Sequence, residues 1–146
     1  MKEVLVTGTF NIVHPGHVRL LEFASKYGRV TVGLNADPYL KRKYGDAALP
    51  LIDRSYVLQS IRYVDEVVVF REDEPSALIL RLKPEYYIKG PDYTLDTLPE
   101  LPAIESVGAH LIIQPDRKEY SSTEIISKAE DIQHHVSAFK KLNKFT

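Results

Sequence analysis

Residues 7–17 read TGTFNIVHPGH and join a short apolar segment to a run of residues with helical spacing. Residues 3–7 are mostly apolar and β-branched, which predicts a buried strand. Gly8 permits a tight turn, and Pro15 is typical of the first turn of a helix, where its missing N–H costs nothing. The stretch therefore predicts a strand, a turn and a helix over residues 15–27 that stops at Gly28.

The same alternation of short strands and helices continues along the chain. Further strands are predicted at residues 29–35, 66–70, 85–89 and 110–114. Asp37 and Asp53 are each predicted to cap a helix, the first a short one and the second a helix that ends at about residue 62. Three further helices are predicted at residues 76–82, 101–107 and 122–130. Residues 43–51 contain Gly45 and Pro50 and predict a mobile loop. This order predicts an α/β fold: a Rossmann-like, open, parallel five-stranded sheet with helices on both faces.

The composition limits both the domain organisation and the partners. The chain has 146 residues, which fits one domain at residues 1–130 and a C-terminal helical extension or tail at residues 131–146. It has no cysteine, which excludes disulfides, thiolate metal sites and cysteine nucleophiles. A net charge of −1 is not typical of proteins that coat nucleic acids. No apolar run reaches the ~20 residues of a membrane span, and no apolar signal core follows Met1. We therefore expect a cytoplasmic protein with no nucleic-acid or membrane partner.

The junction at residues 7–17 also carries the residues best suited to chemistry. In an open parallel sheet, ligands bind beyond the carboxyl ends of the strands. His14 and His17 are three residues apart, so a helical start places them on one face, beside backbone amides that carry partial positive charge. Imidazoles can donate hydrogen bonds to phosphate oxygens, so the pattern favours a polyphosphate site. Two alternatives remain: a pair of surface histidines in a loop, or a zinc site, for which no third ligand is obvious nearby.

The stretch from Thr7 to His17 resembles the HxGH nucleotidyltransferase superfamily, and within it the cytidylyltransferase-like group. Further segments that resemble this group follow in order: VGLNAD at 32–37, DR at 53–54, VDEV at 64–67, IKGPDYT at 88–94 and YSSTEII at 120–126. The resemblance covers residues 3 to about 128. The segments are most similar to heptose-1-phosphate adenylyltransferases and, next, to glycerol-3-phosphate cytidylyltransferases.

The resemblance implies an enzyme that transfers a nucleoside monophosphate from ATP or CTP to a phosphorylated sugar or polyol and releases pyrophosphate. Similarity to the heptose enzymes favours ATP. The alternatives are a cytidylyltransferase that uses CTP and glycerol 3-phosphate, an FMN adenylyltransferase, and a nucleotide-binding module without catalysis. The resemblance also implies Mg²⁺ that arrives with the triphosphate, no dedicated metal ligand in the protein, and a homodimer.

The resemblance assigns roles to positions of this chain. The catalytic residues would be His14, His17 and Lys43. The nucleotide would be bound by residues from four segments: Thr9, Phe10, Lys41, Lys89, Asp92, Ser121, Ser122 and Thr123. Tyr93 would contact base or ribose, or else pack in the core.

Two arginines, Arg54 and Arg117, would bind the acceptor. Simpler roles stay open for several of these residues. The lysines at 41 and 43 could be solvated, Ser121 or Ser122 could only cap a helix, and Arg54 could only pair with Asp53 or a neighbour. Asn11 stands where relatives usually carry aspartate, and Pro91 stands where the heptose enzymes usually carry glycine.

Overall fold

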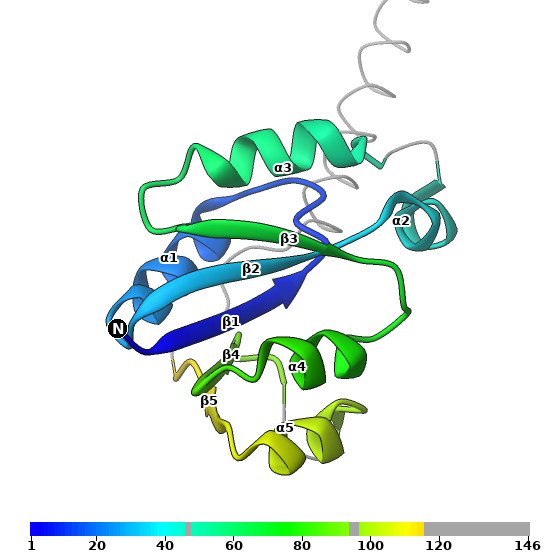
Figure 1. Ribbon diagram of the computed structural model, residues 1–146. Coiled ribbons are helices and arrows are strands. Elements are labelled where there is room, and N and C mark those ends of the chain that lie inside the picture. Colours follow the sequence, from blue (N-terminus) through cyan, green and yellow to red (C-terminus); the bar gives the residue numbers. More distant parts are fainter. Residues whose placement is uncertain (46–47, 94–96, 116–146) are drawn as a thin grey trace, which may run out of the picture.

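The computed structural model describes residues 1–45, 48–93 and 97–115. Five parallel strands form one sheet in the order β3-β2-β1-β4-β5 (Figure 1). The strands are β1 (Glu3–Gly8), β2 (Arg29–Asn35), β3 (Glu66–Phe70), β4 (Tyr86–Lys89) and β5 (His110–Ile113). The helices are α1 (Pro15–Ser25), α2 (Asp37–Tyr44), α3 (Leu51–Gln59), α4 (Ser76–Leu82) and α5 (Leu101–Val107). The predicted α/β fold with an open parallel sheet is confirmed.

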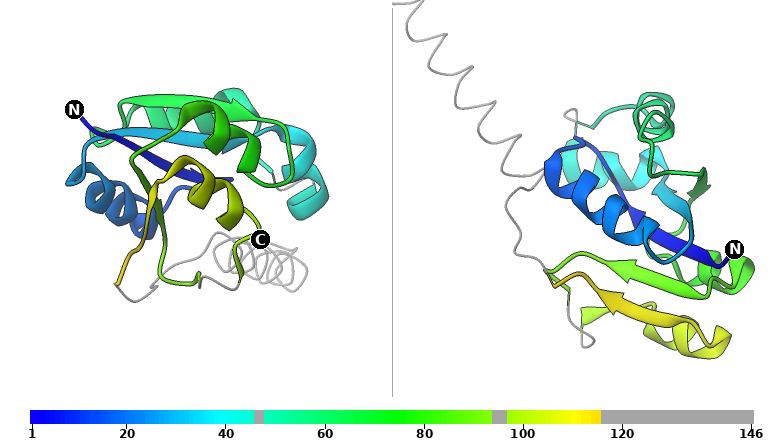
Figure 2. Two further views of the ribbon diagram at one scale, coloured as in Figure 1. Left: turned by 60° about the horizontal axis from the view of Figure 1, so that its bottom comes forward. Right: turned by 90° about the vertical axis from the view of Figure 1, so that its left-hand side faces the viewer.

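Helices cover both faces of the sheet because the strands are apolar on both sides. Val4 and Val6 of β1 pack in one core cluster with Leu21 of α1 and Leu58 of α3. Leu5, which points to the other face, belongs to a second cluster with residues of α4 and α5. Figure 2 shows α4 and α5 together, away from α1 and α3. Continuous apolar strands of this kind are typical of parallel sheets buried on both faces.

Two helix starts differ from the prediction. The N-cap of α2 is Ala36, so Asp37 is the first residue of the helix and not its cap. The N-cap of α3 is Pro50, so Asp53 lies inside the first turn. In both helices the aspartate still sits in the first turn, where a negative charge is favourable. The predicted loop at residues 43–51 is also shorter, because α2 continues to Tyr44.

The predicted helix at 122–130 and the predicted tail at 131–146 lie outside the described residues. The boundary at residue 130 therefore stays a prediction. In the described part of the chain, no helix combines the length and the apolar character that crossing a membrane requires.

Gly33 in the middle of β2 allows α4 to pack closely on the sheet. A Cβ atom at this position would lie 2.6 Å from Leu78 Cδ2 and 2.9 Å from Thr7 Cγ2. We therefore expect Gly33→Ala to lower the free energy of unfolding by about 1–3 kcal/mol, the usual cost of an overpacked core. Urea denaturation would measure the change. Gly90→Ala is the matched control, because a Cβ there meets nothing within 4 Å. Equal stability of the two variants would contradict the close packing of α4.

Candidate active site

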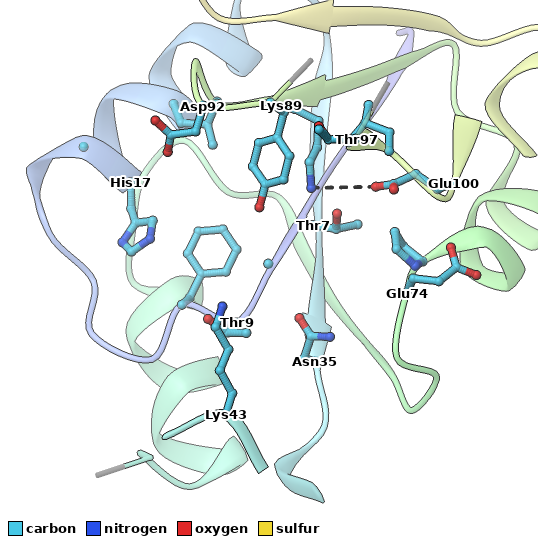
Figure 3. Close-up of a pocket in the computed structure, with 18 of the residues that line it drawn as sticks. Thr7, Thr9, His17, Asn35, Lys43, Glu74, Lys89, Asp92, Thr97 and Glu100 are labelled. Atoms are coloured by element: carbon cyan, nitrogen blue, oxygen red, sulfur yellow. Dashed lines mark ion pairs between the residues drawn. The ribbon is translucent and has the colours of Figure 1, made fainter. Parts of the chain in front are cut away.

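A pocket of about 400 Å³ opens at the carboxyl edge of the sheet. Its wall includes the ends of four strands, at Thr7, Asn35, Phe70 and Lys89, and Gln114 directly after the fifth. Parallel strands all end at the same edge, which is why residues so distant in the sequence meet here (Figure 3). The start of α1, parts of α2 and the segments at residues 73–75, 90–93 and 97–100 complete the lining, so the pocket lies at the edge where the sequence places a ligand.

The two histidines of the HPGH stretch hold each other in place at the start of α1. His14 is the N-cap in an extended conformation, and its Nδ1 accepts a hydrogen bond from the Gly16 amide at 3.1 Å. His17 Nδ1 accepts from the His14 amide at 3.2 Å, and the two rings stack with centroids 3.8 Å apart. An imidazole nitrogen that accepts a hydrogen bond carries no hydrogen, so the hydrogen of each neutral ring is on Nε2. Both rings are therefore fixed with Nε2 as a donor, in residues that line the pocket.

Phe10 supports this arrangement from the loop after β1. It has a positive φ of 46°, and its ring lies 4.9 Å from the His17 ring, centroid to centroid. The ring packs over Gly8, where a Cβ atom would lie 3.0 Å from Phe10 Cε2. Phe10 is almost fully buried and belongs to the core cluster of α1. Thr9, also in the pocket wall, is bonded through Oγ1 to the Tyr44 hydroxyl at 3.4 Å.

Lys89 lies at the end of β4 in a buried network. Its Nζ is 3.7 Å from Glu100 Oε2, and both side chains are more than nine-tenths buried. The Tyr87 hydroxyl donates to the same carboxylate oxygen at 2.6 Å, so the Thr7 hydroxyl, 2.7 Å away, donates to Tyr87. Burial lowers the pKa of Lys89, and the charge of Glu100 opposes that shift. Burial raises the pKa of Tyr87, so it remains a hydrogen-bond donor at neutral pH.

Other cations and polar groups lie around the same space. Lys89 Nζ is 4.2 Å from the centroid of the Tyr93 ring, which favours a cation–π interaction. Lys43, at the end of α2, and Asp92, after β4, both line the pocket. Lys41 is exposed and does not line the pocket. The predicted nucleotide contact of Lys41 thus stays a prediction that this placement does not favour.

Arg54 is placed behind the pocket and not in it. Its side chain is fully buried, and its guanidinium donates to the carbonyls of Leu49 at 2.8 Å, Thr9 at 3.1 Å and Asn35 at 2.7 Å. A fourth bond, at 2.7 Å, reaches Asp37 Oδ1. Arg54 therefore ties the loops that build the pocket to one another. This placement does not favour the predicted acceptor contact, and the ion pair is with Asp37, not with Asp53.

Asn11 also ties these loops together. Its Oδ1 accepts a hydrogen bond from the Leu49 amide at 2.7 Å, which joins the loop after β1 to the loop before α3. Within the described residues its buried Nδ2 has no hydrogen-bond partner. An aspartate at this position would accept the same bond from Leu49 and would have no amide donor to leave unpaired. The unpaired Nδ2 is therefore a cost of carrying asparagine here.

The structure thus brings together most of the predicted site residues. His14, His17, Lys43, Thr9, Phe10, Lys89 and Asp92 line one pocket. Arg117, Ser121, Ser122 and Thr123 lie outside the described residues. Tyr87 and Glu100 were missed, because nothing in the sequence around them signals a buried network. The arrangement offers imidazole and ammonium donors around one cavity, which suits a polyanionic ligand such as a triphosphate.

The comparisons with known proteins agree with this chemistry. The sequence profile of the cytidylyltransferase-like family matches residues 5–128. The chain is 37% identical over 129 residues to D-β-D-heptose 1-phosphate adenylyltransferase of Bordetella bronchiseptica, covering 86% of this chain and 80% of the relative. It is 39% identical over 131 residues to the bifunctional protein HldE of Geobacter metallireducens, but spans only 26% of that longer protein.

A solved structure supports the fold. The lipopolysaccharide core biosynthesis protein from Thermoplasma volcanium superposes with a TM-score of 0.64 at 24% identity, over 77% of this chain and 93% of that one. The profile match covers most of the chain, and the Bordetella relative is matched over most of both lengths. The chain therefore belongs to the cytidylyltransferase-like family.

Proposed function

We propose that the chain transfers the adenylyl group of ATP to a heptose 1-phosphate or a similar phosphorylated sugar and releases pyrophosphate. The observation that carries the proposal is the pair of imidazoles at the start of α1, each fixed with Nε2 as a donor by a hydrogen bond to its Nδ1. The choice of ATP and of the acceptor is supported by the name of the Bordetella relative, a D-β-D-heptose 1-phosphate adenylyltransferase.

The reaction needs no covalent intermediate on the protein. A phosphate oxygen of the acceptor attacks the α-phosphorus of ATP and forms a new P–O bond. The bond between the α-phosphorus and the oxygen that bridges it to the β-phosphorus breaks. The electron pair of that bond leaves with pyrophosphate. The acceptor phosphate is already anionic, so it is a competent nucleophile without a general base.

The protein acts by positioning the two phosphates and stabilising charge. His14 and His17 donate through Nε2 to oxygens of the α-phosphate and of the leaving group, where negative charge spreads in the transition state. Lys43 and Lys89, which line the same pocket, offset the charge of the phosphates. The hydroxyl-rich segment Ser121 to Thr123 would bind the β- and γ-phosphates, and Arg117 the acceptor. These two assignments rest on the resemblance alone.

Mg²⁺ is expected as a companion of the nucleotide. Among the described residues, no three His, Cys, Asp or Glu side chains are grouped so as to hold a metal ion. We propose that the ion is held mainly by phosphate oxygens and water, as Mg²⁺ often is, where it would supply charge neutralisation. The homodimer and the cytoplasmic location stay predictions.

A matrix of nucleotides and acceptors tests the proposal. Pyrophosphate release would be measured with ATP or CTP against D-β-D-heptose 1-phosphate, glycerol 3-phosphate and FMN. We expect the highest kcat/KM for ATP with heptose 1-phosphate, by at least about tenfold, since a binding difference of 1.4 kcal/mol gives that factor. Highest activity with CTP and glycerol 3-phosphate, or with ATP and FMN, would contradict the substrate assignment. ATP binding without pyrophosphate release in any combination would contradict catalysis and favour a nucleotide-binding module.

A further inference from the structure

The pocket has two chemically different sides. His17, Thr9 and Lys43 lie on one side in Figure 3, and Asn35, Glu74 and Glu100 lie on the other, with Lys89 next to Glu100. The first side offers cationic and N–H donors, which suit phosphates, together with one carboxylate, that of Asp92. The second side offers an amide and two carboxylates, and carboxylates repel phosphate but accept hydrogen bonds from hydroxyl groups. The two sides therefore fit different parts of a ligand.

Asn35 is the residue on the second side whose side chain makes no hydrogen bond within the described residues. It is the last residue of β2, it is only 5% exposed, and its side chain points into the pocket (Figure 3). Its backbone carbonyl is held by Arg54 at 2.7 Å, and the strand pairs it with Phe70, so its position is fixed. Within the part of the chain that the structure describes, no hydrogen bond to its side-chain amide is found. The residue is nearly buried, and the surface that remains exposed lies in the pocket wall, so the amide is available to a ligand bound there.

Each of the two carboxylates on this side is bonded to the protein through only one of its own oxygens, Oε2, within the described residues. Glu74 Oε2 accepts from the Ser76 amide at 3.0 Å and from the Ser76 hydroxyl at 2.5 Å. Glu100 Oε2 accepts from Tyr87 and faces Lys89. Across the described residues, neither glutamate makes a hydrogen bond or an ion pair through Oε1. Each side chain is thus oriented by the protein, while one oxygen can accept from a ligand hydroxyl.

We propose that Asn35, Glu74 and Glu100 form the subsite that binds the hydroxyl groups of the acceptor. The inference rests on the proposed function, because that reaction fixes where the acceptor phosphate must be. The phosphate has to reach the α-phosphorus beside His14 and His17, and the three residues line the other side of the same pocket. The carbon skeleton of the acceptor then extends toward the amide and carboxylates. The site selects a polyhydroxylated acceptor, a sugar phosphate, over one with a flat apolar ring.

Kinetics with varied acceptor concentration test this subsite. We expect Asn35→Ala to lower kcat/KM for D-β-D-heptose 1-phosphate by about 10–100-fold, because sites built to bind a hydroxyl group lose much when one partner is removed. The loss should appear mainly in the KM of the acceptor, with the KM of ATP changed less than about twofold, since the histidine side is untouched. Glu74→Gln should lower kcat/KM about tenfold, and it keeps an oxygen for Ser76.

A control and a second measurement separate binding from folding. Glu72→Gln removes an exposed carboxylate next to the subsite that does not line the pocket, and should leave both KM values unchanged. Monodeoxy analogues of the heptose 1-phosphate allow a thermodynamic cycle that combines the loss of one substrate hydroxyl with the loss of one protein side chain. For the hydroxyl that Asn35 binds, removing that hydroxyl should cost as much as Asn35→Ala, and combining both changes should cost little more.

The outcomes distinguish the subsite from the reaction. An active enzyme whose Asn35→Ala and Glu74→Gln variants raise the KM of ATP and not that of the acceptor would overturn the subsite and leave the proposed function standing. Additive losses for every deoxy analogue would also overturn it. A wild-type protein without turnover on any phosphorylated acceptor would overturn both the proposed function and the subsite.

Discussion

Replacing His17 with alanine should lower kcat by about 10²–10³-fold, the usual cost of removing one donor that stabilises charge in a transition state. The reason is the fixed Nε2 donor of this ring, which the bond from the His14 amide to His17 Nδ1 holds toward the pocket. The same bond caps α1, so alanine should also cost about 0.5–2 kcal/mol in stability. Steady-state kinetics with saturating substrates would measure the first effect, and thermal denaturation the second.

A second substitution separates catalysis from capping. Glutamine is favoured at the third position of a helix because it can reach back to the cap amide. His17→Gln should therefore keep the stability of the wild type and still lose rate about as much as His17→Ala. His110→Ala, in an exposed residue of β5 outside the pocket, is the control for removing a histidine. Wild-type kcat in a folded His17→Gln variant would remove His17 from the catalytic residues.

Replacing Arg54 with leucine should lower the free energy of unfolding by about 3–5 kcal/mol, because three carbonyls at buried or partly buried positions lose their donor, at about 1–3 kcal/mol each. The guanidinium donates to these three carbonyls and to Asp37, whose side chain is more than half exposed and would be solvated by water instead. For a chain of this size the melting temperature should fall by about 10 °C. Arg54→Lys should restore little, because one ammonium cannot reproduce a planar fork of donors.

The matched control for Arg54 is another arginine that pairs with an aspartate at the surface. Arg42 pairs with Asp73, and both side chains are more than half exposed. Arg42→Leu should change stability by no more than about 1 kcal/mol. If Arg54→Leu were as mild as this control, then Arg54 would not hold the pocket loops together. If it were stable but unable to use the acceptor, the role first expected from the sequence would be favoured.

The strands and helices could be predicted from the sequence because each is short, apolar and separated by clear breaks such as Gly28 and Pro75. The part of the site around His14 and His17 could be predicted because residues three apart at the start of a helix are also close in space. Lys41 and Lys43 were harder to separate. Both lysines lie in α2, which continues to Tyr44, so the helical period decides which of them faces the pocket. The sequence had suggested that a loop begins at residue 43, and a loop gives no such period.

The contacts that cross the sheet could not be predicted. The bond between Thr7 and Tyr87 joins residues 80 positions apart, and it exists only because β1 and β4 are neighbours in a defined register. Glu100 looks like an ordinary loop charge in the sequence, but at the start of α5 it lies beside Lys89. Asp37 looked like a helix cap, but its carboxylate pairs with Arg54, 17 residues further on. Such partners depend on strand order, which a single sequence does not specify.

The fate of the α-phosphorus tests the central claim most directly. ATP labelled with radioactive phosphorus at the α-position would be incubated with D-β-D-heptose 1-phosphate and the wild-type protein, and the products separated. The account predicts that the label appears in a nucleotide sugar while unlabelled pyrophosphate is released in equal amount. Label that remains in ADP, with phosphate transferred to the sugar from the γ-position, would show attack at the wrong phosphorus and contradict the account.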